Sequence, residues 1–228
     1  MECDRKLCKI AQNCPCKCVP NAKKLYCTLK KKLETIEDLK VLLTDCLADF
    51  WERDSDLIKN KVYEPVISGK FAMILQKQLY KKHFLGMPPN IDIDIEYDKH
   101  LQDAKIIGDK CKYCSDKNCR VKKQSLITEE KKIRPDIVFH ERINDNNNIC
   151  AFEIKCSRAK KMKVLKYSTY KYDYAKLKAL VCGEYEYKYT WGIHLTFFEK
   201  GTVVQIFKNN EISRYKYDKS TEELSEMK

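Results

Sequence analysis

The chain has 228 residues and a formal net charge of +12, with 45 Lys and Arg against 33 Asp and Glu. Hydrophobic residues make up 43% of it, which excludes a disordered chain, and 6 Gly with 6 Pro exclude collagen-like and Pro/Gly-rich repeats. No apolar run approaches the roughly 20 residues of a membrane helix, and the charged, cysteine-rich start does not resemble a signal peptide. We therefore expect a cytoplasmic protein with no membrane partner.

The excess of positive charge suits a polyanionic partner, usually nucleic acid. The alternative is that lysine is simply the default surface residue of this chain. The distribution of charge favours nucleic acid, because basic residues crowd between Lys155 and Lys178 with Asp173 as the one acid among them. Tyrosines interleave with these lysines and can stack on bases. The lysines expected to contact nucleic acid are Lys160, Lys161, Lys163, Lys176 and Lys178; for the last two a solvated helix face is the alternative.

The N-terminal part, residues 1–54, is predicted to be a separate Cys-rich, helical extension of a domain that covers residues 55–228. Residues up to about 22 are rich in cysteine and show no period, whereas apolar residues recur at helical spacing over 23–59. A second helix is predicted over 64–84, and the Pro-Pro pair at 88–89 ends it.

The remaining elements alternate between strands and one helix. Strict alternation of Ile with acids predicts a strand over 91–99, followed by a polar, Cys-containing insertion at about 103–130. Strands are expected at 133–142 and 149–155, a helix at 165–182, and three strands joined by short turns from 191 to 217. This order predicts an α/β fold, with a central mixed β-sheet flanked by helices.

Thirteen cysteines are many for a cytoplasmic protein, and an odd number leaves at least one outside any disulfide scheme. Cys111, Cys114 and Cys119 have a spacing that can supply three ligands to Zn²⁺ or to an Fe–S cluster. The alternative is a loop of reduced thiols, since no second C-x2-C pair matches the first. Cys150 and Cys156 flank a predicted core strand, where cysteine behaves as a small hydrophobe.

Two neighbouring predicted strands carry the residues with the clearest chemistry. Alternation along the second strand places Glu153 and Lys155 on one face, about 7 Å apart. Asp136 follows Pro135 at the start of the first strand, and a short polar turn joins the two strands. If the strands pair antiparallel, Asp136 and Glu153 meet at one end of the pair.

Two carboxylates that close repel each other, and a divalent cation relieves the repulsion. Hard oxygen ligands suit Mg²⁺ or Mn²⁺. A lysine two residues beyond the glutamate can hold an attacking water or stabilise the charge that develops on a phosphate. The set Asp136, Glu153 and Lys155 therefore predicts metal-assisted hydrolysis of phosphodiester bonds.

The segments Arg134-Pro135-Asp136 and Glu153-Ile154-Lys155, each within an apolar strand, resemble the motif of the PD-(D/E)xK nuclease superfamily. The chain looks most like small stand-alone or defence-associated members, in which an acidic residue opens an early helix, here Glu64. An EY-containing strand comes next, here Glu96-Tyr97, and precedes the two motif strands. The resemblance covers about residues 55–208 and leaves out the Cys-rich start and the insertion.

The resemblance implies a restriction-endonuclease-like fold and a metal-dependent nuclease, and we favour DNA over RNA as substrate. Asp136 and Glu153 would bind Mg²⁺ or Mn²⁺, Lys155 would orient water or stabilise charge, and Glu64 would lie at the edge of the site. Glu64 can instead be a helix-start acid favoured by the helix dipole. Many nucleases of this fold act as dimers, so the resemblance leaves a homodimer open.

Two other functions compete with a nuclease. The chain can be a nucleic-acid-binding module on the same fold without catalysis, since fold does not fix function. It can also be a zinc-stabilised interaction protein in which the two motif segments are accidental. The cysteines favour this last alternative, and the strand context of Asp136 and Glu153 disfavours it.

Overall fold

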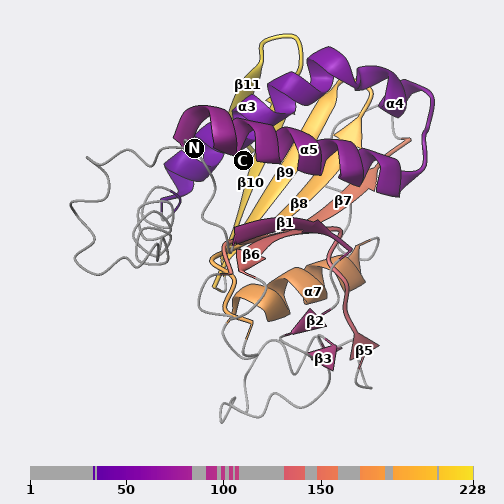
Figure 1. Ribbon diagram of the computed structural model, residues 1–228. Helices are drawn as coiled ribbons and strands as arrows, with labels where there is room; N and C mark the ends of the chain where they lie inside the picture. The colour runs from indigo at the N-terminus through magenta and orange to yellow at the C-terminus, as the bar shows by residue number, and fades with distance from the viewer. Residues whose placement is uncertain are drawn as a thin grey trace, which may run out of the picture.

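The structure is a computed structural model (Figure 1), and it describes residues 33, 35–83, 91–96, 99–100, 103–104, 106–107, 131–141, 148–158, 170–182, 187–209 and 211–227. Its centre is a seven-stranded sheet with helices on both faces. The predicted mixed α/β class is therefore confirmed. Within the described ranges, no helix is both long enough and apolar enough to cross a membrane.

Three helices form the first part of the described chain: α3 (Ile36–Arg53), α4 (Ser55–Lys59) and α5 (Glu64–His83). Thr35 caps α3, because its Oγ1 accepts a hydrogen bond from Asp38 N at 3.2 Å. The prediction of one helix through residue 59 is wrong at Asp54, whose backbone leaves the helical region and separates α3 from α4. The predicted helix over 64–84 agrees with α5 to within one residue.

The strands of the main sheet run in the spatial order β1-β6-β7-β8-β9-β10-β11. Their bounds are β1 (Ile91–Ile95), β6 (Ile137–Glu141), β7 (Cys150–Cys156), β8 (Trp191–Phe198), β9 (Gly201–Lys208), β10 (Glu211–Asp218) and β11 (Glu223–Glu226). All neighbours pair antiparallel except β7 and β8, which are parallel. A parallel pair needs a crossover, and it contains α7 (Lys171–Val181). The predicted antiparallel meander of 191–217 is confirmed.

Four short strands lie outside the main sheet. β2 (Lys99–His100) pairs with β3 (Asp103–Ala104), and β4 (Ile106–Ile107) pairs with β5 (Lys131–Lys132). β3 and β4 lie in the predicted insertion at 103–130, of which residues 105 and 108–130 lie outside the described residues. The Cys-rich segment up to residue 32 lies outside them as well.

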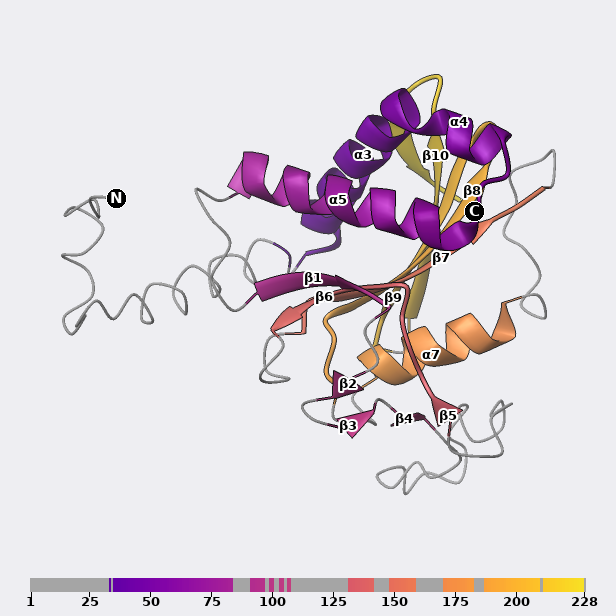
Figure 2. The ribbon, with the colours of Figure 1, turned by 45° about the vertical axis from the view of Figure 1, so that its right-hand side comes forward.

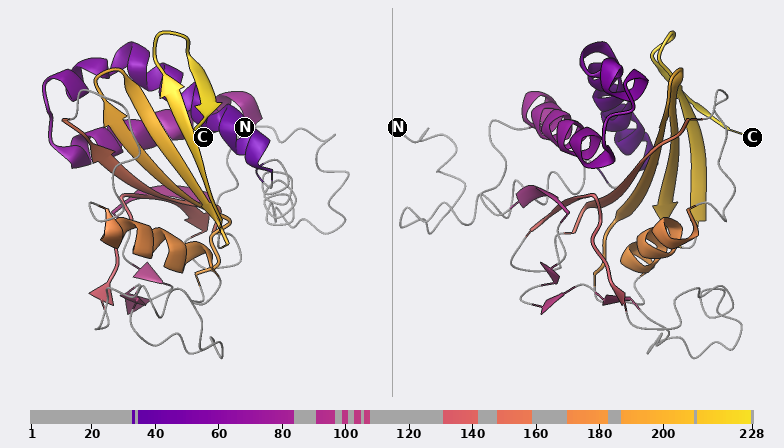
Figure 3. Two further views of the ribbon diagram at one scale, coloured as in Figure 1. Left: turned by 180° about the vertical axis from the view of Figure 1, so that it is seen from behind. Right: turned by 90° about the vertical axis from the view of Figure 1, so that its right-hand side faces the viewer.

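The helices divide between the two faces of the sheet. Figure 2 and the right-hand view of Figure 3 show α3 and α5 over one face and α7 over the other. A large apolar cluster joins α3 and α5 to the sheet, and it includes Leu43, Phe50, Phe71, Phe152 and Phe197. The helix that we assigned to the N-terminal extension therefore shares its core with the predicted domain of residues 55–228. A smaller cluster joins α7 to the opposite face.

A glycine lets α7 approach the sheet closely. A Cβ on Gly192, in β8, would lie 3.2 Å from both Leu177 Cβ and Val181 Cγ1, two atoms of α7. It would also lie 3.3 Å from Phe207 Cβ on β9. The absence of a side chain at this position thus fixes the distance between α7 and β8, and with it the depth at which α7 places its polar residues.

Candidate active site

The ends of β6 and β7 bring Asp136 and Glu153 together, as the sequence predicted. The two strands pair antiparallel with Ile137 opposite Phe152, and Asp136 N donates to Phe152 O at 3.1 Å. Extending this register by one residue places Asp136 opposite Glu153, on the face that α7 covers. Asp136 Oδ2 also accepts a hydrogen bond from Ile154 N at 2.6 Å. The backbone of β7 thereby fixes the orientation of the Asp136 carboxylate.

Glu153 is fully buried, with 0% of its side chain exposed, and its Oε1 lies 2.7 Å from the ammonium of Lys176. Its Oε2 has no hydrogen-bond partner among the described residues. Burial raises the pKa of Glu153 well above its usual value; the Asp136 carboxylate adds to this rise, and Lys176 opposes it. Burial also raises the pKa of Asp136. A cation that approaches these two carboxylates would therefore stabilise their charged forms.

Lys155 points from β7 toward the first residue of α5. Its Nζ donates to Glu64 Oε1 at 2.7 Å and lies 3.8 Å from Asp173 Oδ2. Burial by itself would lower the pKa of Lys155, but the hydrogen bond to Glu64 and the nearby carboxylates raise it overall. Lys155 is therefore a fixed positive charge beside Asp136 and Glu153. Glu64, predicted at the edge of the site, contacts it through this lysine.

Two residues of α7 complete the cluster, and the sequence did not predict the position of either one. Lys176, expected to contact nucleic acid from a helix surface, instead has only 8% of its side chain exposed and binds Glu153. Asp173, one helical turn before it, lies 3.4 Å from Lys176 Nζ. The signal was the i, i+3 spacing of these two charges beside Leu177, which faces the sheet.

The other predicted contact residues lie elsewhere. Lys178 is half-buried on α7, and its carbonyl accepts the hydrogen bond of Cys182 N that closes the helix. Lys160, Lys161 and Lys163 lie outside the described residues, as do Cys111, Cys114 and Cys119. Apart from these predicted residues, His140 of β6 is buried and pairs with Asp94 of the neighbouring strand β1 at 3.0 Å. Cys150 is buried in the core, as predicted, whereas Cys156 is only half-buried at its margin.

The cluster contains more acidic than basic groups. Its four carboxylates belong to Glu64, Asp136, Glu153 and Asp173, and its two ammonium groups belong to Lys155 and Lys176. With all six groups ionised, two negative charges remain without a countercharge inside the cluster. One divalent cation has the charge that neutralises it.

The donor atoms fit a hard cation that keeps water ligands. In the described part of the chain, no three His, Cys, Asp or Glu side chains lie close enough together to hold a metal ion. Asp136 and Glu153 nevertheless offer two neighbouring carboxylates, one with a buried oxygen that lacks a partner. Mg²⁺ commonly binds through one or two carboxylates and completes its shell with water and substrate oxygens.

A row of buried polar side chains continues from Glu153 across the sheet. The registers place His194 of β8 beside Glu153, and Gln205 of β9 beside His194. Burial lowers the pKa of His194 to about 3, so this imidazole is neutral at physiological pH. The rings of Tyr170 and Tyr174 lie 5.0 and 5.1 Å from it, and Tyr174 Oη donates to Gln205 Oε1. The α7 face of the sheet is therefore polar in its middle.

Comparisons of the chain with protein-family models, with curated proteins and with solved structures found no match. Side-chain geometry alone therefore indicates what the site can do. Where β6 and β7 pair, it joins two neighbouring carboxylates, a fixed lysine and two further acids, Glu64 and Asp173. Such a set can bind a divalent cation and stabilise negative charge on a bound phosphate.

Proposed function

We propose that the protein is a Mg²⁺- or Mn²⁺-dependent nuclease that hydrolyses phosphodiester bonds of nucleic acid. The observation that carries this proposal is the convergence of Asp136, Glu153 and Lys155 on one face at the paired ends of β6 and β7. Each of the three was selected by its sequence pattern alone, and strand pairing joins two segments 17 residues or more apart. An accidental motif would give no reason for the complete burial of Glu153 beside Asp136.

The order of elements supports a restriction-endonuclease-like fold. The resemblance calls for a helix opened by an acid, a strand, the two motif strands, a helix and a further strand. The chain supplies α5 beginning at Glu64, then β1, β6, β7, α7 and β8. The contact of Glu64 with Lys155 supports its place at the edge of the site rather than a role limited to the helix dipole.

Each residue of the cluster has a defined part in the proposed reaction. Asp136 and Glu153 would hold the divalent cation, which supplies Lewis-acid polarisation of the phosphate and lowers the pKa of a bound water. Lys155 would hold the attacking water or stabilise negative charge on the phosphate oxygens. Glu64 fixes the ammonium of Lys155 through their 2.7 Å hydrogen bond.

Nucleic acid as the substrate follows from the net charge of +12 and from the basic segment that begins at Lys155. We favour DNA over RNA on the resemblance, and a homodimer on a duplex would fit the same resemblance. Zn²⁺ or an Fe–S cluster at Cys111, Cys114 and Cys119 belongs to the proposal as a separate, structural centre.

The test is cleavage of circular single-stranded and circular duplex DNA, and of RNA, with Mg²⁺, Mn²⁺ or EDTA. We expect cleavage by the wild-type protein with metal and none with EDTA. Glu153→Gln should reduce the rate about 100-fold or more, because it removes a charged metal ligand at constant volume. Salt should weaken DNA binding steeply, since phosphate contacts release counterions.

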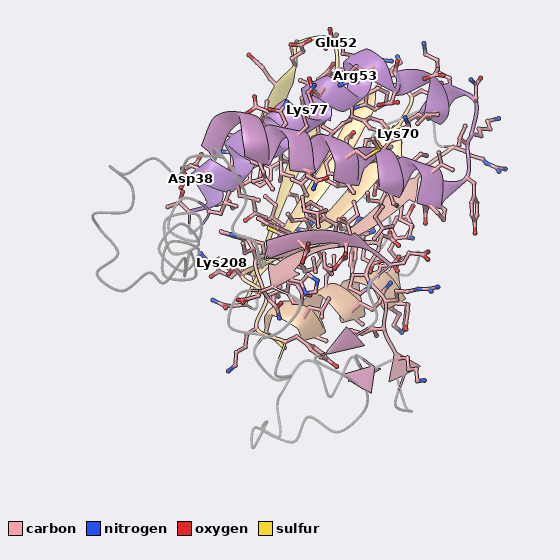
Figure 4. All side chains as sticks on the ribbon, viewed as in Figure 1. Asp38, Glu52, Arg53, Lys70, Lys77 and Lys208 are labelled. Carbon is pink, nitrogen blue, oxygen red and sulfur yellow. The ribbon has the colours of Figure 1, made fainter. Side chains whose placement is uncertain are left out.

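The matched control is Glu52→Gln, the same change at an exposed position of α3, in the upper part of Figure 4 and remote from α7. It should cleave like the wild type. Metal-dependent cleavage that survives Glu153→Gln would contradict the assignment of the site. DNA binding without any cleavage, by a folded protein at saturating metal, would favour the non-catalytic binding module.

A further inference from the structure

Glu153, the proposed metal ligand, is already paired with a cationic side chain of the protein. The ammonium of Lys176 lies 2.7 Å from its Oε1, and the two side chains are 8% and 0% exposed. A carboxylate buried to this degree needs a countercharge, and Lys176 supplies it in the absence of a metal. The lysine thus occupies one oxygen of a carboxylate that a metal ion would also need.

A second anion lies within reach of the same ammonium. Asp173 Oδ1 is 3.4 Å from Lys176 Nζ, and both residues stand one turn apart on α7. The ring of Tyr172 lies 5.3 Å from Nζ on the same helix. Lys176 therefore keeps an ion pair and an aromatic contact if it leaves Glu153, and only its own side chain has to rotate.

We propose that Lys176 is a gate on the metal site: its ammonium competes with the divalent cation for Glu153, and metal binding moves it onto Asp173. The inference rests on the proposed function, because it requires a cation at Asp136 and Glu153. Lys176 is a positioning residue that acts through Glu153. The exchange keeps Glu153 paired at all times and raises the metal concentration that the site needs.

Calorimetric titration with Mn²⁺ at fixed pH and ionic strength tests the gate. Lys176→Met should bind Mn²⁺ at least about tenfold more tightly than the wild type, because one positive charge a few Å from the cation is removed. Lys176→Arg keeps that charge and should stay close to the wild type. Lys70→Met removes a charge from the exposed side of α5 and should change nothing (Figure 4).

The outcomes separate the gate from the proposed function. If the wild type binds Mn²⁺ and Lys176→Met binds it equally or more weakly, the gate is wrong, and the proposed metal site is still supported. Absence of Mn²⁺ binding by both proteins overturns the gate and the metal-dependent nuclease together. Tight binding by Lys176→Met that Glu153→Gln abolishes in the double variant places the cation at Glu153 and supports the gate.

A measurement on the wild-type protein covers the case in which Lys176→Met does not fold. Lysine labelled with ¹³C at Cε gives one NMR signal per side chain, and Lys176→Arg identifies the signal of Lys176. Saturation with diamagnetic Mg²⁺ should shift this signal as the ammonium leaves Glu153, whereas the signal of Lys70 stays in place. An unchanged Lys176 signal in Mg²⁺-saturated protein overturns the gate.

Discussion

The two faces of the sheet differ in the side chains that they bury, and β7 contributes side chains to both. Phe152 and Ile154 point to the face under α3 and α5, whereas Glu153 lies on the face under α7. On the first face aromatic rings pack against one another, with Phe50 4.6 Å from Phe197 and Phe71 6.1 Å from Phe152 between ring centroids. On the second face charged and amide groups are buried next to tyrosines.

The difference separates the apolar core from the candidate site. Apolar burial of the first kind stabilises the folded state directly. Buried polar and charged groups gain little net stability, and well-packed apolar residues in their place are often as good or better. The polar row of Glu153, His194 and Gln205 is therefore hard to explain by stability, and the proposed metal chemistry gives a reason for Glu153.

The largest loss of unfolding free energy is expected when an aromatic ring is removed from the apolar face. Phe71→Ala should lower the free energy of unfolding by about 3–5 kcal/mol, because it leaves a cavity among Phe50, Phe152 and Phe197. Urea unfolding followed by circular dichroism measures the loss. Met73→Ala, two residues on and 64% exposed, should cost less than about 0.5 kcal/mol. Equal losses would mean that this face is not the stabilising core.

A methyl group at Gly192 tests the α7 face through its spacing. Gly192→Ala should cost about 1–3 kcal/mol of unfolding free energy, because the new Cβ crowds Leu177 and Val181. Cleavage should fall further than stability accounts for, since α7 carries Lys176 and Asp173. The matched control is Gly69→Ala in α5, where the nearest atom is Ile95 Cδ1 at an ordinary 3.8 Å. There we expect a gain of about 0.5–1 kcal/mol from helix propensity.

His194 gives the polar face a sensitivity to acid. Its pKa is about 3 in the folded protein and about 6.5 when unfolded, so the unfolded chain binds the extra proton between these values. This imidazole therefore makes stability fall as the pH drops through that window, by at most about 1.4 kcal/mol per pH unit. It lies among Tyr170, Tyr174, Thr196, Gln205 and Glu153, with charges from Asp173, Lys155 and Lys176 nearby.

The comparison of wild type with His194→Gln isolates this effect, because the nearby carboxylates titrate in both proteins. Melting temperatures measured from pH 7 to pH 4 should fall more steeply for the wild type. Parallel curves would show that His194 does not titrate across folding.

The smallest change is expected at Glu153 itself. Glu153→Gln should alter the free energy of unfolding by less than about 1 kcal/mol, because the amide oxygen can still accept from Lys176, and Asp173, at 3.4 Å, remains as the countercharge of that lysine. Chemical denaturation at pH 7 without metal is the measurement. A loss of several kcal/mol would show that the Glu153–Lys176 pair stabilises the fold, and the division between the two faces would fail.

The strands of the candidate site could be predicted because strand periodicity and a short connection leave few alternatives. Glu153 and Lys155 share a face by alternation alone, and a short turn forces β6 and β7 to pair antiparallel. The sequence also indicated α5 with Glu64 at its start. It could not show that Glu64 would reach Lys155, since that contact depends on how α5 packs on the sheet.

For the contribution of α7 the sequence holds only a weak signal, the i, i+3 spacing of Asp173 and Lys176 beside Leu177, which faces the sheet. Lys176 and Lys178 are equally basic in sequence, yet the structure buries Lys176 against Glu153 and leaves Lys178 half-buried. Strand β11 was missed for another reason. Its residues, Glu223 to Glu226, are mostly polar, which suits an edge strand and gives no apolar pattern to detect.

The distances along the chain between the parts of the site have a consequence for the order of folding. Strands β8 to β11 are joined by short turns, so they can pair early at low entropic cost. The contact of Lys155 with Glu64 spans 91 residues, and it forms only after α5 has docked on the sheet. We therefore expect the candidate site to be among the last parts of the chain to assemble, so a partly folded or newly synthesised chain would lack the proposed activity.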